Sequence, residues 1–191
     1  MSVAMEDWPR RHRITVEEYH RMAEVGLLAP DARVELIEGE IIDMPPIGSQ
    51  HAAAVRRLDM LLNRAVSGRA IVSCQSPVEL SELSEAQPDL ALLAPREDFY
   101  DQAHPTAADT LLALEVSDTT ARYDLSTKMS LYARHGIREL WVVDLQRQQL
   151  HIFRNPAGAA YDERLSLHKP GVMPIASLPG VAVDLSSLFH Q

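Results

Sequence analysis

Two short stretches of almost unbroken apolar residues, separated by a segment of helix length, place the strongest limit on how this chain can fold. Residues 111–117 read LLALEVS and residues 140–144 read LWVVD, a composition typical of strands that are buried on both faces. Between them, residues 123–135 carry apolar side chains at helical spacing, and Gly136 ends that pattern. A strand, a helix and a strand in this order predict a right-handed crossover between parallel strands. We therefore expect an α/β fold.

The flanking segments predict that the sheet is mixed and has helices against it. Thr15 and Glu18 form a capping-box signature, so a helix is expected to follow Thr15. Apolar residues at helical spacing predict a second helix over residues 49–66. Alternating residues around Gly39 predict a β-hairpin over 33–44. The remaining predictions are short strands at 70–74, 78–80, 88–93 and 150–154, a polar loop at 94–109, and edge strands and turns over 159–189.

Length and cysteine content limit the domain organisation. A chain of 191 residues is typical of one domain, which we expect to span residues 14–191 after a flexible leader at 1–13. Cys74 is the single cysteine, which excludes a disulfide framework and fits a reducing compartment. The sequence has neither a signal-type apolar core nor a run of apolar residues that could cross a membrane. The expected location is the cytoplasm, without membrane association.

The net charge of the chain is −9, which argues against a general nucleic-acid-binding protein. Such domains usually carry a clear excess of basic residues. An acidic total still permits DNA binding, because a local basic face can attract the phosphates. Part of the negative charge can also belong to carboxylates that hold a metal ion.

Two carboxylates at the edges of apolar strands are the strongest indication of chemistry. Asp89 precedes the residues LALL, and Glu115 follows LLAL. Burying an ionised carboxylate costs free energy unless a partner compensates its charge. Mg²⁺, which takes oxygen ligands and often one or two carboxylates, is one such partner. The alternative is an aspartate that starts a strand and a glutamate paired with a basic side chain, and residue types alone favour that alternative.

Lys128 is the next candidate, because it lies on the predicted helix that follows the strand of Glu115. Beside the apolar stripe its ammonium could stabilise charge on a phosphate or polarise a water molecule. The alternative is an ordinary pair with Asp124 on the helix surface.

Several other polar residues have weaker support. Glu35 and Glu38 lie on the first hairpin, and Glu38 has the alternative of a solvated turn residue. His51 could orient a substrate group, and Arg122 and Tyr123 could contact a backbone phosphate, or all three could be ordinary surface residues. The sequence contains no GxGxxG, GxxxxGK[ST], HExxH or GxSxG motif, and its eight histidines are dispersed without metal-ligand spacing.

The order of these motifs resembles the Uma-two family, over roughly residues 14–189. The residues that carry the resemblance are the run RVELIEGEII from Arg33 with Pro45, Pro46 and His51 after it, then Gln87-Pro88-Asp89, Leu114-Glu115-Val116-Ser117, Asp124 and Lys128, and finally YARHGIRELWVVD from Tyr132 to Asp144. The family is described as restriction endonucleases with a PD-(D/E)xK core. The resemblance implies a restriction-endonuclease-like core, with a mixed β-sheet flanked by helices.

Mapped onto this sequence, the resemblance implies a magnesium-dependent phosphodiesterase site. Asp89 and Glu115 correspond to the two acidic residues of the motif and would hold the metal ion. The lysine usually found two residues after the second acid is absent, because Ser117 stands there. Lys128 resembles a replacement from the next helix, and Glu38 resembles the additional acidic residue of the site.

The sequence-based hypothesis is thus a Mg²⁺-dependent endonuclease, with Mn²⁺ able to substitute, that hydrolyses DNA. Its site would contain Asp89, Glu115, Lys128 and Glu38. Two alternatives stay open: a binding or regulatory module that keeps the nuclease fold without turnover, and a nuclease for RNA or a nucleotide signal. A homodimer is expected, because symmetric pairs are the commonest oligomers.

Overall fold

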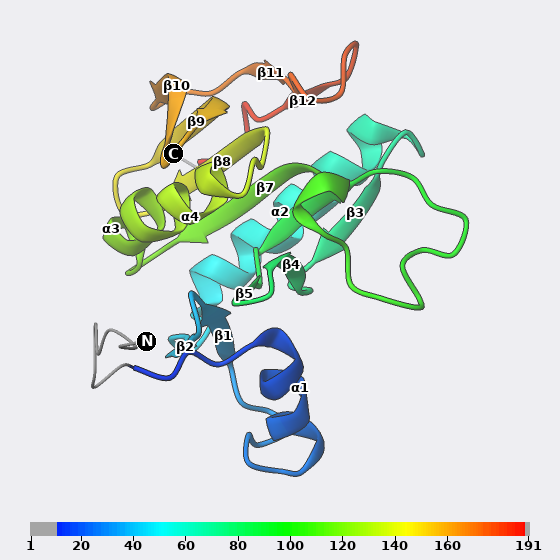
Figure 1. The fold of residues 1–191 in the computed structure, drawn as a ribbon. Helices are drawn as coiled ribbons and strands as arrows, with labels where there is room; N and C mark the ends of the chain where they lie inside the picture. Colours follow the sequence, from blue (N-terminus) through cyan, green and yellow to red (C-terminus); the bar gives the residue numbers. More distant parts are fainter. Residues whose placement is uncertain (1–10, 190–191) are drawn as a thin grey trace, which may run out of the picture.

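The computed structural model describes residues 11–189, in which the strands form three sheets (Figure 1). The central sheet has the strand order β10-β9-β8-β7-β6-β3. Its strands are β3 (Ile71–Cys74), β6 (Leu90–Leu93), β7 (Thr110–Ser117), β8 (Glu139–Asp144), β9 (Gln149–Ala157) and β10 (Ala160–Leu167). A smaller sheet has the order β2-β1-β5-β4, with β1 (Val34–Ile37), β2 (Glu40–Asp43), β4 (Val78–Ser81) and β5 (Ser84–Ala86). Strands β11 (Val172–Pro174) and β12 (Ala182–Asp184) pair with each other.

The parallel pairing that the sequence predicts for the two apolar strands is confirmed for β7 and β8. These two strands are parallel, with Glu115 beside Val142, whereas the other neighbours in the central sheet are antiparallel. The sheet is therefore mixed, as expected. Strand β6 pairs with β7 on its other side, so Leu90 lies beside Leu114. This pairing brings Asp89, directly before β6, next to the end of β7 that carries Glu115.

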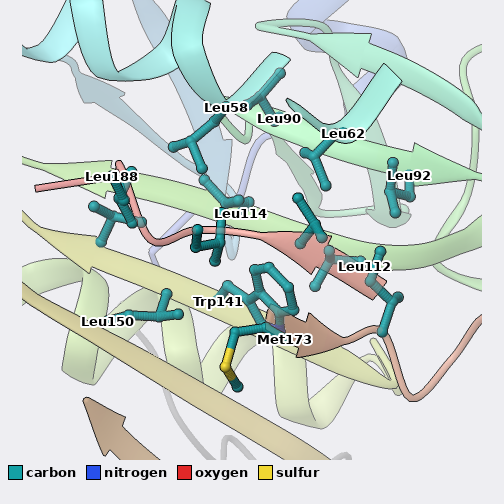
Figure 2. Close-up of a cluster of buried hydrophobic side chains, with 14 of the residues drawn as sticks. Leu58, Leu62, Leu90, Leu92, Leu112, Leu114, Trp141, Leu150, Met173 and Leu188 are labelled. Atoms are coloured by element: carbon teal, nitrogen blue, oxygen red, sulfur yellow. The ribbon is translucent and has the colours of Figure 1, made fainter. Parts of the chain in front are cut away.

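Alternation along β7 decides which side chains enter the main core and which face the other way. Leu112, Leu114 and Val116 belong to the cluster of buried residues under helix α2 (Ser49–Val66), together with Trp141 of β8 (Figure 2). Successive side chains of a strand point to opposite faces, so Glu115 points away from α2. Its carboxylate is thereby directed to the face that the segment after β7 covers.

That second face is covered by a helical segment whose middle is not a regular α-helix. The segment consists of α3 (Ala121–Tyr123), the π-helical turn η2 (Asp124–Lys128) and α4 (Met129–Arg134). The sequence predicted one continuous helix over 123–135, so the π-helical turn is a difference. Such turns are rare and occur often at functional sites. Both ends of this one, Asp124 and Lys128, are buried polar residues.

The N-terminal helix lies against the smaller sheet. Helix α1 (Val16–Glu24) begins with the predicted capping box between Thr15 and Glu18. Strand β5, which the sequence did not predict, joins the first hairpin to β4. Of the predicted leader, residues 1–10 lie outside the described residues. Within residues 11–189, no helix is both long and apolar enough to cross a membrane.

Truncation of Leu58 to alanine is expected to destabilise the protein by about 2–5 kcal/mol, because Leu58 is fully buried between α2 and the central sheet. Met60 lies on the same helix with 44% of its surface exposed, so Met60→Ala is the matched control. Urea unfolding of the two variants measures the difference. Equal unfolding free energies for both would contradict this account of the core.

Candidate active site

Five of the seven sequence-predicted site residues meet at a pocket of about 300 Å³ between the central sheet and the first hairpin. Its polar lining comes from segments that are far apart in the chain. They include Glu35 of β1, His51 of α2, Asp89 before β6, Glu115 of β7, and Tyr123 and Lys128 of the segment after β7. Arg33, Asp43, Asp118 and Asp124 also line the pocket. Carboxylates thus outnumber basic side chains, and the pocket favours a cation.

Asp89 is held in place through both carboxylate oxygens. Its Oδ2 accepts a hydrogen bond from the backbone N–H of Val116 at 2.8 Å and lies 3.0 Å from Nε2 of His51. Its Oδ1 accepts a longer bond from Nε2 of Gln75 at 3.3 Å. The bond to Val116 ties Asp89 to the residue directly after Glu115. This contact between the Asp89 side chain and the backbone of β7 holds the Asp89 carboxylate beside the strand that carries Glu115.

Glu115 uses one carboxylate oxygen for its protein contacts. Oε1 accepts hydrogen bonds from Nζ of Lys128 at 3.0 Å and from the hydroxyl of Tyr132 at 2.7 Å. Burial raises the pKa of Glu115, although the nearby Lys128 ammonium acts in the opposite direction. Within residues 11–189, no hydrogen bond to Oε2 is formed. This oxygen is the one that remains for a ligand.

Lys128 is a buried ammonium between two carboxylates. Its side chain is 5% exposed, and Nζ lies 2.8 Å from Oε1 of Glu35 and 3.0 Å from Oε1 of Glu115. Burial alone would lower the pKa of Lys128, but Glu115 and Glu35 outweigh it and raise the pKa, so the side chain stays charged. The alternative pair with Asp124 is not formed. The Asp124 carboxylate accepts bonds from the hydroxyls of Ser117 and Thr120 instead.

The first hairpin contributes Glu35 and Asp43 to the pocket, whereas Glu38, the residue chosen from the sequence, lies outside it. Glu38 lies in the turn with a left-handed φ of 53°. It is 47% exposed, pairs with Arg134 at 2.9 Å and does not line the pocket. Glu35 is buried and also accepts the backbone N–H of Gln87 at 2.6 Å. Its position between apolar residues of β1 was the available signal, the same signal that identified Glu115.

The three predicted substrate-binding residues separate into two groups. His51 and Tyr123 line the pocket, whereas Arg122 is exposed and does not. Nδ1 of His51 and the hydroxyl of Tyr123 are buried atoms without a hydrogen-bond partner within residues 11–189. The hydrogen bond to Asp89 is the main reason why the pKa of His51 is raised. Two unsatisfied polar atoms in one pocket are suited to contact a polar ligand.

The side chains of the pocket fit a hard divalent cation that is coordinated by only two protein carboxylates. Asp89 and Glu115 are adjacent, and Oε2 of Glu115 is available. Among the described residues, the pocket does not bring three ligand atoms from histidine, cysteine or acidic side chains within 4.8 Å of one another. Mg²⁺ commonly binds through one or two carboxylates and keeps several water molecules, so this set suits it. A metal that needs a full set of protein ligands would fit poorly.

Comparison with known proteins identifies the family of the chain. The sequence model of the Uma2 family, described as "Putative restriction endonuclease", matches residues 16–186. The chain belongs to the Uma2 family. This Uma2 chain is also similar in fold to a solved protein described as "a putative nuclease belonging to DUF820 from Anabaena variabilis ATCC 29413". The similarity has a TM-score of 0.68 at 19% identity and covers 92% of this chain and 97% of the other. No curated protein matches the sequence.

Proposed function

We propose that this Uma2 protein is a Mg²⁺-dependent endonuclease that hydrolyses DNA phosphodiester bonds, with Mn²⁺ able to replace Mg²⁺. The observation that carries the proposal is the buried ammonium of Lys128 between Glu35 and Glu115, in the same pocket as Asp89. A lysine and two acidic residues at one point are the side chains that the nuclease motif requires. Lys128 supplies the ammonium from η2, although Ser117 occupies the usual position of the lysine.

Asp89 and Glu115 would hold the cation in this proposal, with Oε2 of Glu115 as one ligand atom. Bound there, Mg²⁺ would lower the pKa of a coordinated water molecule and neutralise charge on the phosphate. His51 would keep the Asp89 carboxylate oriented through its bond to Oδ2. Tyr132 would do the same for Glu115 through Oε1.

Lys128 would act directly on the reacting groups. Its ammonium cannot rotate freely, because it donates hydrogen bonds to both Glu35 and Glu115. A fixed positive charge stabilises the negative charge that develops on a phosphate during attack, without reorganisation at that moment. The ammonium can also orient the attacking water molecule. Glu35 is a positioning residue, since it acts through Lys128.

The unsatisfied groups of the pocket would bind the substrate. Nδ1 of His51 and the hydroxyl of Tyr123 are available for phosphate oxygens. Arg33 adds a positive charge at the rim. The pocket is otherwise acidic, in agreement with the net charge of −9. We therefore expect DNA binding at this site to depend on the cation, because bare phosphates would be repelled.

Two glutamates of the first hairpin provide a matched test. Glu35→Gln is expected to lower Mg²⁺-dependent cleavage of plasmid DNA roughly 10- to 100-fold, as is usual for residues that position a ligand. Glu38→Gln should cleave at the wild-type rate, because its carboxylate pairs with Arg134 outside the pocket. Initial rates with Mg²⁺, and with chelator as the blank, measure both.

Other outcomes of this assay would identify the alternatives. Equal loss of activity in both variants would contradict the proposed role of Glu35 as a positioning residue. Absence of cleavage by a wild-type protein that binds Mn²⁺ would favour a binding module that keeps the nuclease fold. Cleavage of RNA or of a cyclic dinucleotide, but not of DNA, would show that the substrate is a different phosphodiester.

We also propose that residues 14–191 act as one domain and that two copies form a homodimer. A symmetric pair would place one site on each strand of a DNA duplex. Sedimentation of the purified protein at micromolar concentration should give twice the monomer mass of 21.3 kDa. A mass equal to the monomer would contradict the dimer without affecting the proposed chemistry.

A further inference from the structure

Two histidines and a buried glutamate meet outside the pocket described above. His20 belongs to α1, Glu85 to β5, and His104 to the loop before η1 (Ala107–Asp109). One ligand atom from each residue lies within 4.8 Å of the other two. Nε2 of His20 is 2.8 Å from Oε2 of Glu85, and the two imidazole rings are 5.9 Å apart between centroids. None of the three residues lines the pocket of Asp89 and Glu115.

Glu85 has few partners for a buried carboxylate. Its side chain is only 5% exposed, and within residues 11–189 its carboxylate takes part in one hydrogen bond, with His20. Buried carboxylates are normally paired and fully hydrogen-bonded, because their desolvation is costly. A cation shared with two imidazoles would supply the missing compensation.

The backbone near each residue is fixed by contacts between the three segments. The N–H of Val16 at the start of α1 donates to the carbonyl of Glu82 at 2.8 Å. Glu85 pairs with Leu36 in the smaller sheet, and the N–H of Glu79 donates to the carbonyl of Pro105 at 2.9 Å. The backbone of all three segments is thus held in place. Small movements of the side chains would therefore be enough to bring their ligand atoms to the spacing that a metal ion requires.

We propose that His20, Glu85 and His104 bind one divalent late first-row transition metal ion, for which zinc is the probe. Two imidazoles and one carboxylate are a known three-ligand set for zinc, with a fourth position for water. In tetrahedral geometry with bonds of about 2.0–2.1 Å the ligand atoms would be about 3.3 Å apart. Oε2 of Glu85 and Nε2 of His20, which are 2.8 Å apart, would separate slightly. The ion would hold α1 and the loop of His104 against the smaller sheet.

Zinc titration of the full chain after removal of metals by chelator tests the proposal. Calorimetry should show a zinc site that weakens at least tenfold in His104→Ala. His168→Ala, which removes another exposed histidine, should bind zinc as the wild type does. Asp89→Asn should also keep this site, because Asp89 lies in the other pocket.

Thermal unfolding gives a second readout that is independent of any nuclease activity. Since His104 is exposed, the variant and the wild type should melt at the same temperature in chelator. Zinc should raise the melting temperature of the wild type and leave His104→Ala unchanged. No zinc binding at micromolar concentration, or wild-type zinc affinity in His104→Ala, would overturn the proposal.

Discussion

Glu115→Gln is expected to abolish Mg²⁺-dependent DNA cleavage, with a loss of about 1,000-fold or more, while the fold stays intact. Glutamine has the same shape and still offers an oxygen to Lys128 and Tyr132. It lacks the negative charge that would hold the cation near Asp89. A metal ion contributes several kcal/mol to the stabilisation of the transition state, and about 1.4 kcal/mol corresponds to a factor of ten in rate. Initial rates on plasmid DNA, together with circular dichroism, measure both expectations.

The matched control is a second buried glutamate in the neighbouring strand. Glu139 of β8 is as buried as Glu115, but it pairs with Arg154 on the far side of the sheet from α3 and outside the pocket. Glu139→Gln should therefore cleave at the wild-type rate under conditions where it is folded. Cleavage by Glu115→Gln at the wild-type rate would refute the proposed role of Glu115 as a metal ligand.

Lys128→Met is expected to lower the free energy of unfolding by about 3–5 kcal/mol and to abolish cleavage as well. Removing one partner of a buried ion pair leaves the other charges uncompensated, and this costs about that much. Here two acidic side chains, Glu35 and Glu115, would lose their shared counter-charge. For a chain of this size the melting temperature should fall by roughly 6–20 °C. Urea unfolding and thermal unfolding measure the two quantities.

A double variant separates the loss of charge compensation from a simple loss of packing. Lys128→Met combined with Glu35→Gln should be less destabilised than Lys128→Met alone, because one unpaired charge is removed together with its partner. Lys169→Met, at an exposed position, should leave stability unchanged. A double variant as unstable as the sum of its single variants would show that the Lys128–Glu35 pair has no coupling energy.

Parts of the site could be predicted because they follow from local patterns. Glu115 interrupts an apolar strand, and the alternation of side chains then directs it to the face opposite α2. The sequence did not distinguish Glu35, which lines the pocket, from Glu38, which does not, because a strand residue and a turn residue look equally acidic in sequence. The environment of Glu35 depends on the pairing of β1 with β5, a strand that the sequence did not reveal.

Other features depend on contacts between distant segments. With Ser117 in place of the usual lysine, the sequence offered Lys128 as the replacement, but it did not show which carboxylates Lys128 would contact. The π-helical turn brings Lys128 to Glu115 from 13 residues further along the chain. His20 and His104 likewise had no ligand spacing along the chain, yet their side chains meet at Glu85.

The sequence by itself determined the strand–helix–strand unit, the capped first helix and the two acidic residues at the strand edges. These features rest on hydrophobic periodicity and on the cost of burying charge, which act over a few neighbouring residues. Tertiary structure alone decided that Lys128 lies between Glu35 and Glu115. The reason is physical: a buried ammonium is stable only where separate segments bring enough carboxylates to it, and that convergence is a property of the packed sheet.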